Sequence, residues 1–122
     1  MSTNKNFPKY RTKASPNPLD AIHHIAVVVP EIDKGVAWYT DNFHCTVDYV
    51  DETWALLNFS NTKLALVLPD QHPAHFAVTR HDAEKFGTLT VHRDGLESIY
   101  IEDLAGNPLE ILKDNTTQPS DE

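Results

Sequence analysis

The chain has 122 residues and a hydrophobic fraction of 40%, which suits one compact domain and is too short for two ordinary ones. Its formal net charge of -8 disfavours nucleic-acid binding, and its longest apolar run, Ile25 to Val29, is far below the roughly 18 residues that span a membrane. The single cysteine, Cys45, cannot form an internal disulfide, and the N-terminus lacks an apolar signal core, so a cytoplasmic location is expected.

The first half of the chain predicts a leader and then one strand-helix-strand unit. Residues 1–19 are expected to be a flexible polar leader, because they contain three prolines and no apolar period. One domain, residues 20–113, should begin with a strand over 22–29 and a helix over about 32–42. Three short antiparallel strands are expected next, over 45–50, 54–59 and 63–68.

The second half begins after an extended link from Pro69 to Pro73. Only one or two helical turns are expected in it, near Asp82 to Phe86. Its strands are predicted over 75–79, 87–92, 98–102 and 108–113. Residues 114–122 are expected to form a flexible acidic tail.

An internal repeat relates the two halves. At an offset of 51, His24-Ile-Ala-Val aligns with His75-Phe-Ala-Val, and the acid-rich helix starts after them align as well. Further along the offset becomes 45, where Leu64-Ala-Leu-Val overlies Leu109-Glu-Ile-Leu, so the second copy has lost six residues. The lost residues shorten the predicted second helix.

The repeat predicts an α+β fold of two β-α-β-β-β modules, over about residues 20–68 and 74–113. Curved mixed sheets should surround a concave cavity. Because side chains alternate along a strand, only one of the adjacent His23 and His24 is expected to point into that cavity. The aliphatic residues Ile25, Val27 and Val29 lie on the face opposite to His24 and should pack against the helix.

The same alternation predicts a cluster of metal ligands. His75 should share the cavity face, with Phe76 and Val78 packed beneath the second helix. Glu110 should point the same way, because its neighbours in the last strand are apolar core residues. Two imidazoles and a carboxylate match a facial triad, which binds a divalent ion and leaves positions open for substrate. The alternative is three unrelated polar residues.

Three stretches of the sequence resemble the vicinal oxygen chelate superfamily. The first is His24-Ile-Ala-Val with Trp38-Tyr39 after it, the second is His75-Phe-Ala-Val, and the third runs from Ser98 to Leu112. The superfamily includes lactoylglutathione lyases, methylmalonyl-CoA epimerases, extradiol dioxygenases, and fosfomycin- and bleomycin-resistance proteins. Trp38 and Tyr39 are expected at the core and rim of the helix.

The resemblance supports His24, His75 and Glu110 individually as ligands of Fe, Mn, Ni or Zn. Its lyases and epimerases usually have a fourth ligand, Glu or Gln, at the position of Ala65, and alanine cannot coordinate. A three-ligand centre is closer to the dioxygenase and fosfomycin-transferase arrangements. Tyr100 resembles a dioxygenase tyrosine and is the predicted catalytic residue, although such a tyrosine is also a common wall residue.

The remaining histidines are expected to be solvated or locally hydrogen-bonded, with His72 near enough to His75 to enter the cavity mouth. They are His23, His44, His72, His81 and His92. No general base can be assigned from the sequence.

Two functions stay open: a glyoxalase-like metal-dependent enzyme, of lyase, isomerase or Fe(II) dioxygenase type, and a non-catalytic small-molecule binding or sequestering protein. Trp54 and Tyr49 could line an aromatic groove in the second case. A homodimer is expected, because open sheets pair to cover their edges. The ligands could then come from one chain or, in a swapped pair, from two.

Overall fold

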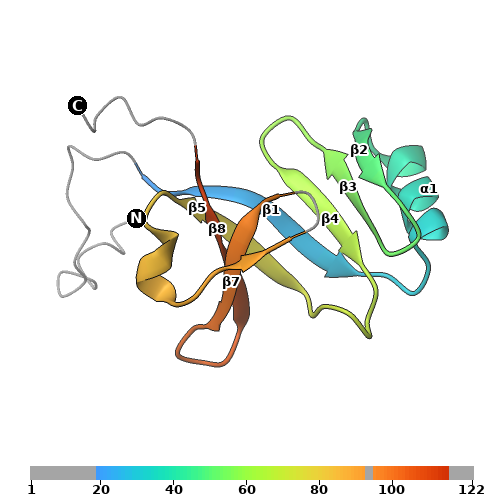
Figure 1. Cartoon of the computed structure of the whole chain (residues 1–122). Coiled ribbons are helices and arrows are strands. Elements are labelled where there is room, and N and C mark those ends of the chain that lie inside the picture. Colours follow the sequence, from blue (N-terminus) through green and yellow to red (C-terminus); the bar gives the residue numbers. More distant parts are fainter. Residues whose placement is uncertain (1–18, 93–94, 116–122) are drawn as a thin grey trace, which may run out of the picture.

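The computed structural model describes residues 19–92 and 95–115, whose strands form one mixed eight-stranded sheet (Figure 1). The first module contains β1 (Ala21–Val28), α1 (Ile32–Asn42), β2 (Thr46–Val50), β3 (Trp54–Asn58) and β4 (Lys63–Val67). The second contains β5 (His75–Arg80), the 3₁₀ helix η2 (Ala83–Phe86), β6 (Thr90–Val91), β7 (Glu97–Glu102) and β8 (Pro108–Lys113). The α+β class and the order of elements are confirmed.

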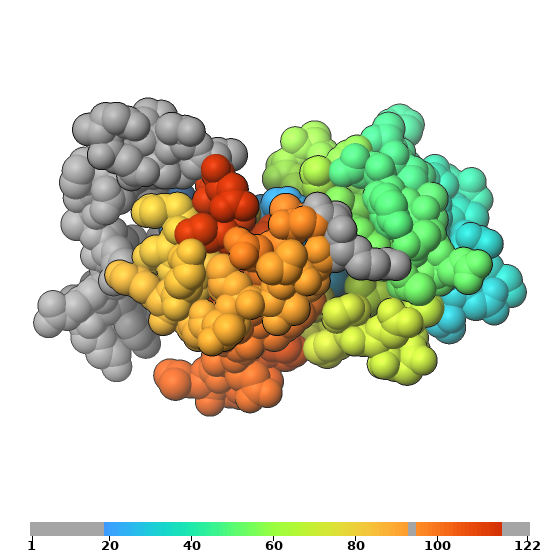
Figure 2. All heavy atoms as spheres, in the orientation of Figure 1, coloured from blue at the N-terminus to red at the C-terminus, as the bar shows by residue number. Residues whose placement is uncertain are grey.

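The two modules join through their first strands. The strand order is β2-β3-β4-β1-β5-β8-β7-β6, with β1 antiparallel to β5, and each of these two strands parallel to the last strand of its own module. Ala26 pairs with Ala65 in the first module, and Ala77 pairs with Glu110 in the second. These pairs are equivalent under the sequence repeat, so its register is confirmed. The modules occupy opposite ends of the molecule (Figure 2).

Helix α1 covers one face of the first module and supplies its main core. Buried Ile32 packs there with Ala55, Leu57 and Leu66, and several half-buried apolar residues surround this cluster. Gly35 lets the helix approach the sheet closely, because a β-carbon there would lie 3.2 Å from a methyl group of Leu66. We call the opposite face of the sheet the site face.

The outer side of α1 differs from the prediction. Tyr39, expected at the rim, is half-buried and packs against the core cluster. Trp38, expected in the core, is 56% exposed, and its ring lies against those of Tyr39 and Phe43. The prediction of Trp38 as a core residue is wrong, because the face of this short helix that packs on the sheet contains Ile32, Gly35 and Val36.

The second module has less helical cover than the sequence predicted. Its helix is a single 3₁₀ turn that contacts β7 and β8, so Phe76 on β5 remains 37% exposed where we expected it beneath a helix. The strand predicted over 87–92 is reduced to Thr90 and Val91. Gly87 itself cannot belong to a strand, because its φ of 142° ends the 3₁₀ turn and lies outside the β region.

The predicted leader and tail lie almost entirely outside the described residues. Only Leu19 of the leader and Asp114 and Asn115 of the tail are described. Within the described ranges, no helix has both the length and the apolar character needed to cross a bilayer.

Replacing Gly87 with alanine should destabilise the fold. Its φ of 142° is nearly exclusive to glycine, and a β-carbon would lie 2.5 Å from the terminal methyl group of Ile99. We expect Gly87→Ala to lower the free energy of unfolding by about 1 to 3 kcal/mol in urea denaturation. Gly106→Ala is the control, because Gly106 also has a positive φ but has nothing within 4 Å, and it should cost less. Equal losses would show that the contact with Ile99 is unimportant.

Candidate metal centre

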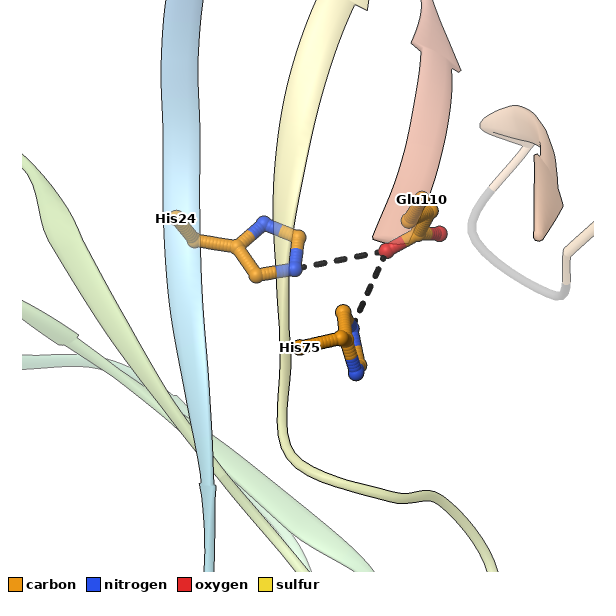
Figure 3. Close-up of side chains that lie close together, drawn as sticks. All are labelled: His24, His75 and Glu110. Atoms are coloured by element: carbon orange, nitrogen blue, oxygen red, sulfur yellow. Dashed lines mark ion pairs between the residues drawn. The ribbon is translucent and has the colours of Figure 1, made fainter. Parts of the chain in front are cut away.

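His24, His75 and Glu110 converge on the site face from three neighbouring strands, β1, β5 and β8 (Figure 3). The Nε2 atoms of the two histidines lie 3.4 and 3.5 Å from the same carboxylate oxygen, Oε1 of Glu110. The three ligand atoms all lie within 4.8 Å of one another. The structure therefore brings together the three residues predicted from the sequence, and it does so within one chain.

The two spacings between the histidine nitrogens and Oε1 of Glu110 fit ligands of a shared divalent ion. Charge-assisted hydrogen bonds are typically about 2.7 to 2.9 Å long, so separations of 3.4 and 3.5 Å are within ion-pair distance but longer than a short hydrogen bond. Ligands bound about 2.0 to 2.2 Å from one ion are separated by about 3 to 3.5 Å. Two neutral imidazoles and a carboxylate are also a donor set that Zn, Fe, Mn and Ni accept.

Glu110 is held in its ionised form. Burial opposes ionisation, but interactions with His24, His75 and Ser98 outweigh it and keep the pKa of the carboxyl well below its usual range. The side chain is only 7% exposed. A buried carboxylate that stays charged needs positive partners, and a divalent ion between the two imidazoles would supply them.

His75 is oriented by the link between the modules. Its Nδ1 donates to the backbone carbonyl oxygen of Pro73 at 2.8 Å, because a carbonyl can only accept. This bond fixes the proton on Nδ1 and leaves the Nε2 lone pair directed at the cluster, as metal-binding histidines require. Burial alone would lower the pKa of His75, but the contacts with Glu110 and Pro73 raise it overall.

His24 is oriented by its neighbour His23, although strand alternation predicts His23 on the other face. The pairing of β1 with β5 shifts register between Ile22 and His24, which marks a β-bulge at His23. The bulge interrupts the alternation of side chains, and the Nδ1 atoms of His23 and His24 lie 2.8 Å apart. If Nδ1 of His24 donates across this contact, its Nε2 is left to bind an ion.

Two polar residues next to Glu110 were not predicted as part of the metal centre. Ser98 on β7 is 1% exposed, and its hydroxyl lies 2.7 Å from Nε2 of His92. The same His92 nitrogen lies 3.7 Å from Oε2 of Glu110. The alternation that places Tyr100 beside Glu110 also places Ser98 on the site face. The position of Ser98 could therefore have been predicted from the sequence. His92 had none, because it lies just beyond a two-residue strand.

Tyr100 lies opposite Glu110 in the β7–β8 pairing. Its ring packs edge to face against the ring of His75, with the two ring centres 5.1 Å apart. The hydroxyl of Tyr100 is 3.4 Å from Nδ1 of His72. The rings of these two residues are stacked, with their centres 5.9 Å apart. The expectation that His72 lies near His75 is confirmed, with ring centres 6.3 Å apart. Burial and the negative charge of Glu110 raise the pKa of Tyr100 well above its usual range, so its phenol stays protonated.

An open hollow of about 710 Å³ lies beside this aromatic pair. It is bounded by Gln71, His72, Pro73, Tyr100, Ile101, Glu102 and Pro108. The three candidate ligands are not among its lining residues, so the hollow adjoins the cluster across Tyr100 and does not enclose it.

Solved structures with the same arrangement of elements identify the fold. A hypothetical protein from Bacillus halodurans C-125 superposes with a TM-score of 0.64 at 12% identity, covering 81% of this chain and 97% of that one. A glyoxalase/bleomycin resistance protein/dioxygenase superfamily member from Vibrio splendidus 12B01 superposes with a TM-score of 0.62 at 12% identity, covering 79% of this chain and 100% of that one. The chain has the fold of this superfamily.

This is the superfamily that the sequence motifs resemble, and the agreement concerns the fold alone. No protein-family model and no curated protein matches the sequence. Ala65, where lyases of the superfamily were expected to have a fourth ligand, is 3% exposed and packs with Ala26, Leu56 and Val67. The first module is therefore apolar at the position equivalent to Glu110.

The ion pair between His75 and Glu110 should make the stability of the metal-free protein depend on pH. The pKa of His75 is raised above 6.5, so its contribution is complete below about pH 6.5 and is lost as pH rises through the folded pKa. The pKa of Glu110 is lowered below 4.5, so its contribution is complete above about pH 4.5 and is lost on further acidification. Both charges are present between these values.

We therefore expect the wild type to exceed Glu110→Gln in free energy of unfolding most strongly near pH 5.5, with a smaller difference near pH 9. Urea denaturation in the presence of a chelator measures both proteins. A difference that stays constant or grows toward pH 9 would contradict the assigned ion pair.

Proposed function

We propose that this protein is a divalent-metal-dependent enzyme of lyase, isomerase or dioxygenase type, acting on a small oxygen-rich substrate. The observation that supports it is the buried convergence of His24, His75 and Glu110, with the second nitrogen of each histidine already engaged. Three protein ligands leave coordination positions open, and an ion bound there would polarise substrate oxygens as a Lewis acid.

Tyr100 is the proposed catalytic residue of the chain itself. Its protonated phenol lies on the strand next to Glu110 and borders the open hollow, so it can donate a hydrogen bond to a substrate oxygen. Nδ1 of His72 lies 3.4 Å from that hydroxyl. The hollow bounded by both side chains is the proposed path by which a small substrate reaches the cluster.

A second candidate function is binding or sequestration without catalysis. The observation that favours it is on the site face of the first module, where the rings of Tyr49 and Trp54 lie 4.8 Å apart. Trp54 packs over the apolar cluster that includes Ala65. The first module therefore has an aromatic surface next to the position that, by the resemblance, holds a fourth metal ligand in lyases of the superfamily. Such a surface would bind planar apolar molecules with or without an ion.

The metal site can be tested by element-resolved metal analysis after reconstitution with Fe(II), Mn(II), Ni(II) or Zn(II). We expect about one ion per wild-type chain and a loss of at least tenfold in affinity for His75→Ala, which removes a ligand. His44→Ala is the control, since His44 is exposed in the segment between α1 and β2, and it should bind as the wild type does. Absence of binding with every metal would favour the second candidate function.

We also propose that the protein is a cytoplasmic homodimer. The edge strand β2 presents the exposed apolar side chains of Val47, Tyr49 and Val50. An uncovered apolar edge favours association with a second copy. Size-exclusion chromatography with light scattering should therefore give twice the mass of the chain. A monomer at micromolar concentration would refute the dimer and leave the metal cluster, which one chain completes, unaffected.

A further inference from the structure

We propose that Ser98 and His92 are positioning residues of the metal centre, which hold one oxygen of Glu110 so that the other faces the ion. The proposal rests on the metal-dependent function proposed above. It concerns which carboxylate oxygen binds and how many coordination positions remain for substrate.

The two oxygens of Glu110 face different partners. Oε1 lies 3.4 and 3.5 Å from the Nε2 atoms of His24 and His75. Oε2 lies 3.7 Å from Nε2 of His92, on the side of β8 that β7 and β6 occupy. The Ser98 hydroxyl lies 2.7 Å from that same His92 nitrogen, and a hydrogen bond from Ser98 is among the interactions that lower the pKa of Glu110. One oxygen is thus directed at the two candidate histidine ligands and the other at His92, whose nitrogen contacts Ser98.

The direction of the hydrogen bonds follows from the donors available. An ionised carboxylate can only accept, so Ser98 must donate its single hydroxyl proton to Glu110. The lone pairs of the Ser98 oxygen then accept the proton on Nε2 of His92, which lies 2.7 Å away. The chain His92 to Ser98 to Glu110 leaves no choice of rotamer for the buried hydroxyl, which is 1% exposed.

The backbone fixes both positioning residues. Ser98 pairs with Leu112 on β8 and with Thr90 on β6, so it lies inside the sheet. Both backbone groups of His92 are used in the turn after β6: its amide donates to the carbonyl oxygen of Leu96 at 2.7 Å, and its carbonyl oxygen accepts from Gly95 at 2.9 Å. Hydrogen bonds on both backbone groups of His92 therefore hold the residue that presents its imidazole to Ser98.

The polar chain occurs only in the module that has the carboxylate, within the described part of the protein. Glu110 pairs with Tyr100, and Ser98 lies two residues before Tyr100. The equivalent residues of the first module are Ala65, which pairs with Leu56, and Trp54 two residues earlier. Because both modules share a backbone plan, the sheet does not require a serine at this position. The module with the glutamate has the serine, and the module with alanine at the equivalent position has a tryptophan in place of the serine.

A carboxylate with one oxygen engaged in this way should bind an ion through the other oxygen alone. Monodentate binding leaves one more position open than bidentate binding, and residues that orient a ligand typically contribute about 10 to 100-fold to metal affinity. Removing Ser98 should therefore weaken binding and release Oε2, which can then join the coordination shell.

Cobalt(II) is the probe for the test, because its visible absorption reports coordination number as well as occupancy. We expect Ser98→Ala and His92→Ala to lower Co(II) affinity about 10 to 100-fold and to weaken the absorption band per bound ion, as coordination number rises. Ser98→Thr keeps the hydroxyl and should restore both properties. Thr90→Ala and His81→Ala are matched controls, since these residues are exposed on the same hairpin and near η2, and both should resemble the wild type.

Wild-type affinity and spectrum in both Ser98→Ala and His92→Ala, together with loss of binding in His75→Ala, would overturn the positioning role and keep the metal site. Absence of Co(II) binding by the wild type would overturn the proposed function and this inference together. Weaker binding in Ser98→Ala with an unchanged spectrum, and no rescue by Ser98→Thr, would also contradict it, because that pattern indicates a general packing defect.

Discussion

The antiparallel pairing of β1 with β5 is the constraint on which the candidate site depends. It joins the two modules edge to edge and places Ala26 opposite His75, so that His24 and His75 lie on adjacent strands and on the same face. β8 lies on the other side of β5 and contributes Glu110 to the same cluster. Three ligands separated by up to 86 residues are thus held by backbone pairing in the middle of one sheet, where strand geometry is most rigid.

Electrostatics follow from this placement. A carboxylate in the centre of a sheet is costly unless positive groups or donors surround it. Here the surrounding groups are two imidazoles on one side and a serine backed by a third imidazole on the other. The arrangement keeps Glu110 ionised and ready to bind an ion, while the apolar first module around Ala65 provides no competing ligand.

The sequence was sufficient to predict the modules and the convergence of the three candidate ligands, because both depend on local periodicity and on an internal repeat. Helix α1 and strand β8 have the predicted bounds, and the repeat offsets match the register of the strand pairs. The predictions failed where the regular period breaks. The bulge at His23 brings two adjacent histidines together, and the single turn of η2 leaves Phe76 partly exposed.

The residues around the ligands were harder to predict, because their positions depend on how distant segments close on one another. His72 comes from the link between modules and His92 from a hairpin turn, and neither segment has a periodic pattern that assigns a face. Ser98 was on the correct face by alternation, but only the fold shows that it contacts Glu110. X-ray absorption spectroscopy of the zinc-loaded protein tests the central claim most directly, because it counts imidazole ligands and measures their distances. The account predicts two imidazoles and additional oxygen ligands at about 2.0 to 2.2 Å, whereas an all-oxygen shell or a single imidazole would contradict it.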